Sequence, residues 1–245
     1  MILVLGGTAE ARALAADLHD RGVPVTSSLA GRVARPRLPP GAVRIGGFGG
    51  PDALARWLGE HGVSAVIDAT HPFAERISAS AARACLTASV PLLRLERPGW
   101  IERSGDRWTW VDSLEGAAAA IGRLGAKRVL LTTGRQGLGA FAQVLDVWFL
   151  IRCVEPPDPP LPPAGQVLLD RGPYTLAGEG ELIDRHRIDL VVTKDSGGQD
   201  TVAKLDAARQ RRLPVIVVRR PVRPAGTETV ADVPAALAWS LAHAG

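Results

Sequence analysis

Short apolar runs alternate along the chain with longer stretches in which apolar residues recur at helical spacing. A short apolar run that ends in Gly, Pro or a polar turn predicts a buried strand, whereas apolar residues at helical spacing predict an amphipathic helix. We expect strands at residues 2–5, 23–27, 65–68, 91–95, 108–111, 128–132, 147–152, 167–170, 190–193 and 215–218. We expect helices at residues 10–21, 51–61, 74–88, 113–124, 182–187, 200–212 and 233–243. This alternation is typical of α/β proteins whose mainly parallel sheets are covered by helices.

One segment interrupts the alternation. Residues 97–100 read Arg-Pro-Gly-Trp and are followed by the polar residues 102–106. Pro and Gly disfavour both helix and strand interiors, so this segment is the best candidate for a domain junction. We predict a first Rossmann-like domain at residues 1–100 and a second Rossmann-like domain at residues 101–245.

Composition narrows the class of protein. Hydrophobic residues make up 46% of the chain, which is enough for a substantial core, and no apolar run approaches the roughly 20 residues that cross a bilayer. The two cysteines, Cys85 and Cys153, lack the spacing of a disulfide framework or a metal site. We therefore expect a soluble cytoplasmic protein with no membrane contact and no metal, as a monomer or weak oligomer.

The charge balance is basic, with a formal net charge of +4. A basic protein can bind nucleic acid or an acidic small molecule. The arginines are scattered, no long basic run occurs, and few aromatic residues lie among them to stack on bases. We therefore expect no nucleic-acid partner. The basic charge then reflects either a composition biased toward Arg or a cationic cleft for an acidic ligand.

A glycine turn follows the first expected strand. Gly6, Gly7, Thr8 and Glu10 lie where this strand passes into the first helix. Backbone N–H groups and the positive end of the helix favour a pyrophosphate there. The turn is shorter than G-x-G-x-x-G, so an ordinary strand-to-helix connection remains an alternative.

The end of the second expected strand carries no acidic residue. Enzymes selective for NAD commonly place Asp or Glu there to bind the ribose hydroxyls. Here the sequence offers Ser28 and Arg32, a hydroxyl and a guanidinium that suit a 2′-phosphate. The pattern favours NADPH over NADH as the cofactor.

Two further segments are candidates for the cofactor site. Gly46, Gly47, Phe48 and Gly49 would allow the backbone to pass close to a flat ligand, although a flexible surface loop fits equally well. Residues 70–72, which are Thr70, His71 and Pro72, follow the strand at 65–68, at the edge where α/β sheets bind ligands. His71 is our candidate proton donor, with water, or a histidine that is only hydrogen-bonded, as the alternatives.

Polar residues also follow strands in the second half of the chain and at the end of the first. Such residues either bind an anion or form a solvated rim. The candidates for binding an acidic substrate are Arg94, Glu96, Arg97, Thr133, Gly134, Arg135, Tyr174, Lys194, Asp195, Ser196 and Gly197.

A set of these motifs resembles the precorrin-6A reductase family of corrin ring biosynthesis, and the resemblance spans nearly the whole chain. The segments at 68–74 and 193–198 are specific, whereas the glycine turn is not. The motifs are Gly6-Gly7-Thr8-x-Glu10, Asp68-Ala69-Thr70-His71-Pro72-Phe73-Ala74, Arg94-x-Glu96-Arg97-Pro98, Thr132-Thr133-Gly134 and Thr193-Lys194-Asp195-Ser196-Gly197-Gly198.

The resemblance implies two Rossmann-like domains with the active site in the cleft between them. It implies that NADPH reduces one carbon–carbon double bond of precorrin-6A to give precorrin-6B, on the route to cobalamin. Such a polycarboxylate tetrapyrrole would be neutralised by Arg94, Arg97, Arg135 and Lys194. The alternatives are a cobalt-precorrin-6A reductase of the anaerobic route, another NADP-dependent α/β reductase or epimerase, and a non-catalytic nucleotide- or nucleic-acid-binding module.

Overall fold

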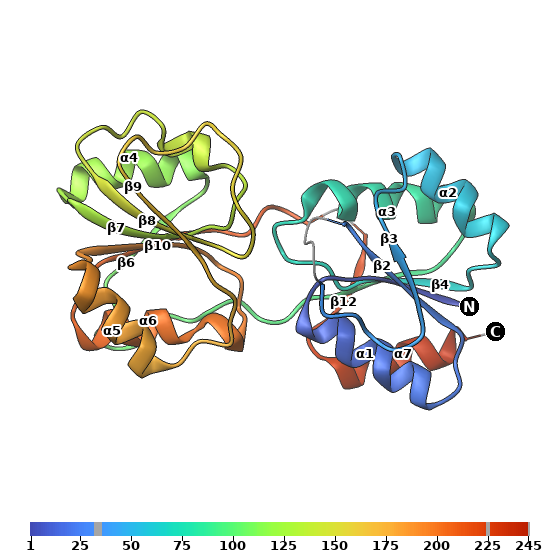
Figure 1. Ribbon diagram of the computed structural model, residues 1–245. Helices are drawn as coiled ribbons and strands as arrows, with labels where there is room; N and C mark the ends of the chain where they lie inside the picture. The colour runs from blue at the N-terminus through green and yellow to red at the C-terminus, as the bar shows by residue number, and fades with distance from the viewer. Residues whose placement is uncertain (32–35, 224–225, 245) are drawn as a thin grey trace. The chain divides into compact units, whose positions relative to one another are not determined.

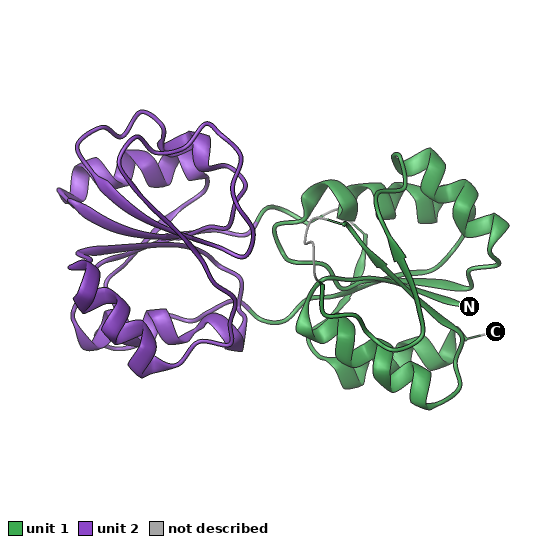
Figure 2. Cartoon of the chain, in the orientation of Figure 1, with its two compact units in different colours: residues 1–98, 221–245 green, residues 99–220 purple. Residues whose placement is uncertain are grey.

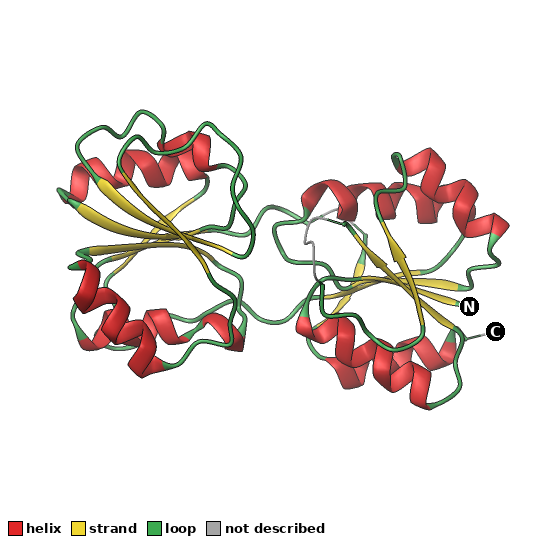
Figure 3. Cartoon of the chain, in the orientation of Figure 1, coloured by secondary structure: helices red, strands yellow, loops and turns green. Residues whose placement is uncertain are grey.

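The computed structural model describes residues 1–31, 36–223 and 226–244 (Figure 1). The chain forms two compact units (Figure 2). Unit 1 contains Met1–Pro98 and Pro221–Gly245, and unit 2 contains Gly99–Arg220. Each unit consists of one parallel sheet with helices on both faces (Figure 3).

The sheet of unit 1 has six parallel strands in the order β12-β5-β4-β1-β2-β3. Helices α1 and α7 cover one face, and α2 and α3 cover the other (Figure 1). The strands are β1 (Ile2–Leu5), β2 (Val25–Leu29), β3 (Ala42–Ile45), β4 (Ala65–Asp68), β5 (Leu92–Leu95) and β12 (Glu228–Val230). The helices are α1 (Ala9–Asp20), α2 (Pro51–Glu60), α3 (Glu75–Ala88) and α7 (Val233–Ala242).

The central strands of unit 1 are buried on both faces, as their continuous apolar runs predict. Along β1, Ile2 and Val4 pack toward α1 and α7, whereas Leu3 and Leu5 pack toward α2 and α3. Counted from β3, the strand order is the 3-2-1-4-5-6 order of a Rossmann sheet, with β12 in the sixth place. The order reverses between β1 and β4, and ligands of such sheets bind beyond the carboxyl ends of the strands at this point.

Unit 2 has a second six-stranded parallel sheet, in the order β6-β11-β10-β7-β8-β9. Helix α4 covers one face, and α5 and α6 cover the other (Figure 1). The strands are β6 (Trp108–Val111), β7 (Arg128–Thr132), β8 (Trp148–Cys153), β9 (Gly165–Leu169), β10 (Leu190–Lys194) and β11 (Val215–Val218). The helices are α4 (Leu114–Leu124), η1 (Leu138–Phe141), α5 (Leu176–His186), η2 (Gln199–Thr201) and α6 (Ala203–Gln210). The sheet has the same Rossmann order with β7 counted first, β6 in the sixth place and the reversal between β7 and β10.

The end of the chain corrects the predicted domain division. Residues 221–245 belong to unit 1, although the sequence analysis assigned them to a second domain at 101–245. Strand β12 pairs with β5, with Thr229 opposite Arg94, and Ala236 of α7 is fully buried in the core that α1 shares with the sheet. The sequence analysis missed β12 because Glu-Thr-Val contains no apolar run.

The ten strands expected from the sequence are all present, with bounds that shift by at most a few residues. Strand β3 was missed because it is an exposed edge strand with an arginine at its third position. Helix α5 begins at Leu176 rather than at residue 182, because Thr175 caps its first turn. The earlier start was not predicted because Gly178 and Gly180 interrupt the apolar pattern. No helix among the described residues is long and apolar enough to span a membrane.

Candidate functional site

The loops that follow the strands of unit 1 lie at one edge of the sheet, because all six strands run parallel. Next to the reversal between β1 and β4 there is a small pocket. Its lining comes from the carboxyl end of β5, the first turn of α1 and the loops after β1, β4 and β5: Thr8, Glu10, Ala69, Thr70, Pro72, Leu95, Glu96 and Arg97. The pocket therefore brings together cofactor candidates and substrate candidates from distant parts of the sequence.

The glycine turn after β1 is built by backbone conformation and by one threonine. Gly7 has a φ of +116°, which disfavours any other residue, and a Cβ at Gly7 would meet no atom within 4 Å. Thr8 caps α1 by accepting a hydrogen bond from the Ala11 N–H, and its hydroxyl donates to the Ala69 carbonyl at 2.8 Å. Thr8 thus joins the β1 loop to the β4 loop directly at the reversal.

Glu10 and Arg97 bind one another at the rim of the pocket. The Arg97 Nη1 lies 2.6 Å from the Glu10 Oε2, and both side chains are largely buried. Glu10, on the first turn of α1, was predicted to bind the cofactor, and Arg97 was predicted to bind the substrate. Because the two charges compensate each other here, Arg97 offers less attraction to a substrate carboxylate than the sequence suggests, and Glu10 repels a pyrophosphate less.

Arg94 occupies the centre of a buried polar network. Its side chain extends from β5 and is only 6% exposed. The guanidinium pairs with the carboxylates of Asp68 and Glu96 and also donates to the hydroxyls of Thr70 and Ser78. Its charge is already compensated within unit 1, so it holds the β4 and β5 ends together instead of presenting a free cation to a substrate.

Glu96 is likewise part of this network. Besides Arg94, its carboxylate accepts hydrogen bonds from Arg223, with Nη2 at 2.8 Å. Burial acts to raise the pKa of Glu96, but the hydrogen bonds and charges of Arg94 and Arg223 outweigh it and hold the pKa below its usual value. Glu96 is therefore an ion-pair anchor between β5 and the segment that returns to unit 1.

His71 lies in the loop after β4 and is exposed. Its Nδ1 lies 3.2 Å from the Phe73 backbone N, in position to accept its hydrogen bond. This bond favours the neutral tautomer that carries the proton on Nε2. Because the acid form of histidine has both ring nitrogens protonated, this bond does not by itself support proton donation, and the role stays a prediction.

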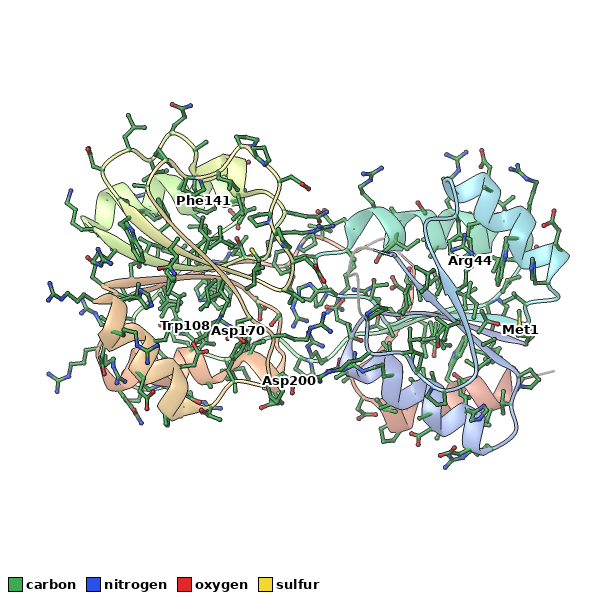
Figure 4. All side chains as sticks on the ribbon, viewed as in Figure 1. Met1, Arg44, Trp108, Phe141, Asp170 and Asp200 are labelled. Atoms are coloured by element: carbon green, nitrogen blue, oxygen red, sulfur yellow. The ribbon has the colours of Figure 1, made fainter. Side chains whose placement is uncertain are left out.

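The carboxyl ends of β2 and β3 carry the remaining cofactor candidates. Ser28 is buried at the end of β2, and the Gly46–Gly49 loop follows β3, with positive φ at Gly46 and Gly49. Arg32 lies outside the described residues. The sequence analysis missed Arg44, which extends from β3 toward Ser28 and this loop; Figure 4 labels it.

In unit 2, several substrate candidates surround the reversal between β7 and β10. Thr133 is 5% exposed, and its hydroxyl has no hydrogen-bond partner among the described residues. Gly134 and Gly197 have positive φ, while the side chains of Arg135 and Ser196 are half-buried. Lys194, the last residue of β10, is also half-buried. These groups stay candidates for the substrate.

Asp195 holds the two ends of unit 2 together. Its side chain is buried, with Oδ1 accepting a hydrogen bond from the Trp100 N–H at 2.9 Å and Oδ2 lying 3.3 Å from the Arg220 Nε. The carboxylate thereby anchors both the entry and the exit of unit 2. A buried anion with these partners is poorly suited to bind a polycarboxylate, and the assignment of Asp195 to the substrate site stays a prediction.

Tyr174 lies beside a buried ion pair that the sequence did not reveal. The guanidinium carbon of Arg152 is 3.9 Å from the centroid of the Tyr174 ring, and Arg152 pairs with Glu179. Burial raises the pKa of Tyr174 despite the nearby Arg152 charge, which makes the phenol a weaker acid. Lys204 lies close to the same pair, and burial lowers its pKa to about 7.

Across the described residues, no cluster of three or more His, Cys, Asp or Glu side chains could hold a metal ion. The chemistry supported by unit 1 is binding of a dinucleotide at the β1–β4 reversal. The unit holds Thr8, a positive-φ glycine and the N-terminus of α1 at that position.

Comparisons with known proteins agree over almost the full chain. Residues 1–240 match the family described as "Precorrin-6x reductase CbiJ/CobK". A precorrin-6A reductase from Rhodococcus erythropolis is 54% identical over 239 residues, covering 97% of this chain and 96% of the relative. One from Mycobacterium tuberculosis is 49% identical over 239 residues with the same coverage. A cobalt-precorrin-6A reductase from Priestia megaterium is 32% identical over 240 residues, covering 93% of each chain.

A solved structure described as "CobK precorrin-6A reductase" superposes with a TM-score of 0.92 at 44% sequence identity. The superposition covers 99% of this chain and 96% of that structure. The α/β fold with two parallel sheets, expected from the sequence, is thereby confirmed.

Proposed function

Because the chain belongs to the precorrin-6x reductase family, we propose that it reduces one carbon–carbon double bond of precorrin-6A with NADPH as the hydride donor. The product is the dihydro compound, precorrin-6B. The observation that carries the cofactor part is the glycine turn at the β1–β4 reversal of a Rossmann sheet. The substrate part rests on relatives at 54% and 49% identity that are named precorrin-6A reductases.

The preference for NADPH is supported by the end of β2. The strand reads Val-Thr-Ser-Ser-Leu and ends without the carboxylate that would bind ribose hydroxyls and repel a 2′-phosphate. Ser28 offers a hydroxyl at this edge. The residues present therefore fit a phosphorylated adenosine better than an unphosphorylated one.

The reduction requires one hydride and one proton. When bound, the reduced nicotinamide supplies the hydride to one carbon of the double bond, and the neighbouring carbon must then take a proton. Gly6, Gly7 and Thr8 would hold the pyrophosphate through backbone N–H groups at the start of α1. Arg94, bound to Asp68 and Glu96, fixes the loop ends that border the pocket. His71 is the proposed donor of the proton, through Nε2.

The substrate carries many acetate and propionate groups, so cations should contribute to its binding. Because carboxylates of unit 1 compensate the charges of Arg94 and Arg97, we propose that Arg135 and Lys194 supply most of the positive charge that binds the substrate. Thr133, Gly134, Ser196 and Gly197 would supply hydroxyl and backbone donors around the β7–β10 reversal. The buried, unpartnered Thr133 hydroxyl supports this assignment, because buried polar atoms normally have a partner.

The main alternative is a cobalt-containing substrate. The relative with that name is 32% identical, against 54% for the relative from Rhodococcus erythropolis, which favours the metal-free ring. The test is to mix the purified protein with NADPH and precorrin-6A and to follow both cofactor oxidation and the tetrapyrrole spectrum. Oxidation of one NADPH for each ring reduced is expected. Faster turnover of cobalt-precorrin-6A would refute the metal-free assignment, and absence of turnover with either ring would refute the proposal.

A further inference from the structure

Arg44 lies where a Rossmann sheet receives the adenosine ribose of a dinucleotide. Strands β2 and β3 pair in parallel, and Ser28 is directly opposite Arg44 in this pairing. Both residues are close to the carboxyl ends of their strands, and the Ser28 carbonyl accepts a hydrogen bond from the Gly6 N–H of the glycine turn that follows β1. In this fold the end of the second strand, or an arginine near it, contacts the 2′ position of the ribose.

Neutral groups hold the Arg44 side chain in a fixed orientation. Its Nη1 donates to the Gly46 carbonyl at 2.6 Å, and its Nη2 donates to the Gly47 carbonyl at 2.7 Å. The guanidinium carbon lies 3.7 Å from the centroid of the Phe48 ring. The Ser28 hydroxyl is 3.4 Å from Nη1, so the serine and the guanidinium face the same space.

Arg44 differs in its charge environment from three other arginines of the strand ends. Arg94, Arg97 and Arg152 each form an ion pair with a carboxylate. Among the described residues, no carboxylate pairs with Arg44. A guanidinium has five N–H donors, so after the contacts with the two carbonyls it still has donors for an anion.

A cation that is oriented by neutral groups and lies beside a serine hydroxyl is suited to a phosphate. Arginine binds phosphate through short, charge-assisted hydrogen bonds, and orienting the guanidinium beforehand reduces the entropy lost on binding. We infer that Arg44, with Ser28, binds the 2′-phosphate of NADPH and is the residue that selects this cofactor over NADH. This inference rests on the proposed use of NADPH and assigns its selectivity to one side chain.

The inference can be tested without substrate or turnover. Adenosine 2′,5′-bisphosphate and adenosine 5′-monophosphate differ only in the 2′-phosphate, so calorimetric titration of the full-length protein with each isolates that group. We expect the wild-type protein to prefer the bisphosphate. In Arg44→Gln, affinity for the bisphosphate should fall about 10- to 100-fold, the loss expected for charge-assisted hydrogen bonds, while affinity for the monophosphate stays unchanged.

Two further variants separate phosphate binding from other effects. Arg56→Gln removes the same charge from an exposed position on α2 and should leave both affinities unchanged. Arg44→Lys keeps the charge but loses the planar donor pair, and should show an intermediate loss. If Arg44 acts only by holding the Gly46–Phe48 loop, Arg44→Gln should weaken both ligands equally, and the inference is then wrong.

The outcomes for cofactor and residue are distinct. A wild-type protein that prefers the bisphosphate, together with an Arg44→Gln variant that keeps this preference, overturns the role of Arg44 and leaves NADPH use intact. A wild-type protein that does not distinguish the two ligands refutes the NADPH selectivity itself. Arg32→Gln, titrated in parallel, tests the sequence-based candidate, and loss of the preference in that variant alone also overturns the inference.

Discussion

Replacement of Arg94 by methionine tests the buried network at the ends of β4 and β5. The substitution preserves much of the side-chain volume but removes the cation that lies between Asp68 and Glu96. Glu96 keeps its contact with Arg223, and Asp68 keeps its hydrogen bonds from Thr70. The main cost is therefore an uncompensated Asp68, and breaking a buried pair in this way typically costs about 3–5 kcal/mol.

Urea denaturation should show this loss, and hydrogen exchange should locate it in β1, β4 and β5 of unit 1, with unit 2 unchanged. The double variant Arg94→Met with Asp68→Asn is the matched control, because it removes the uncompensated charge and should recover much of the stability. The wild-type Glu96 has a lowered pKa, so its contribution to stability is present above the unfolded pKa and is lost as the pH falls through the folded pKa. The Arg94→Met variant should lose less stability than the wild type as the pH falls through this range. An Arg94→Met protein as stable as the wild type would refute the network.

Three other substitutions address separate parts of the molecule. Above the Lys204 pKa of about 7 the folded protein releases the lysine proton while the unfolded chain retains it, so wild-type stability should rise between pH 7 and about 8.5. In urea titrations of Lys204→Met this rise should disappear, and an unchanged slope of stability against pH would contradict the lowered pKa. His71→Ala should lower kcat at least about 100-fold and abolish the pH dependence of kcat if this residue donates the proton, whereas retention of most turnover would limit it to a structural role. Arg135→Ala should raise the KM for the tetrapyrrole, by an amount that shrinks at high salt, without changing the KM for NADPH; the reverse pattern would exclude it from the substrate site.

Every strand that is buried on both faces was predicted, because a continuous apolar run is typical of such a strand. The sequence Ile-Leu-Val-Leu at β1 is typical of a central strand of a parallel sheet. The more exposed edge strands β6 and β9 were predicted as well. The edge strands β3 and β12 were missed because an arginine interrupts the first and the second contains only one apolar residue, whereas the exposed strand β9 contains the apolar run Val-Leu-Leu. Missing β3 also concealed Arg44, whose place opposite Ser28 follows only from strand pairing.

The site residues show a similar limit. The motif positions lie at the carboxyl ends of strands, as the sequence predicted. A charged residue in a motif looks the same whether it binds a ligand or another side chain, however. Arg94 and Asp195 were expected to bind the substrate because they are charged residues at strand ends, and their partners at positions 68 and 220 are distant along the chain. Only the folded structure could show those partners.

The order in which the strands are synthesised has a consequence for biogenesis. Every part of unit 2 is contiguous, so this unit can complete its sheet as soon as it leaves the ribosome. Unit 1, which is made first, must wait for residues 221–245, with its β5 edge unpaired and the part of the core that α7 covers still exposed. A nascent chain halted after residue 220 should therefore have a folded unit 2 and an incomplete unit 1 with exposed apolar surface, to which a chaperone can bind.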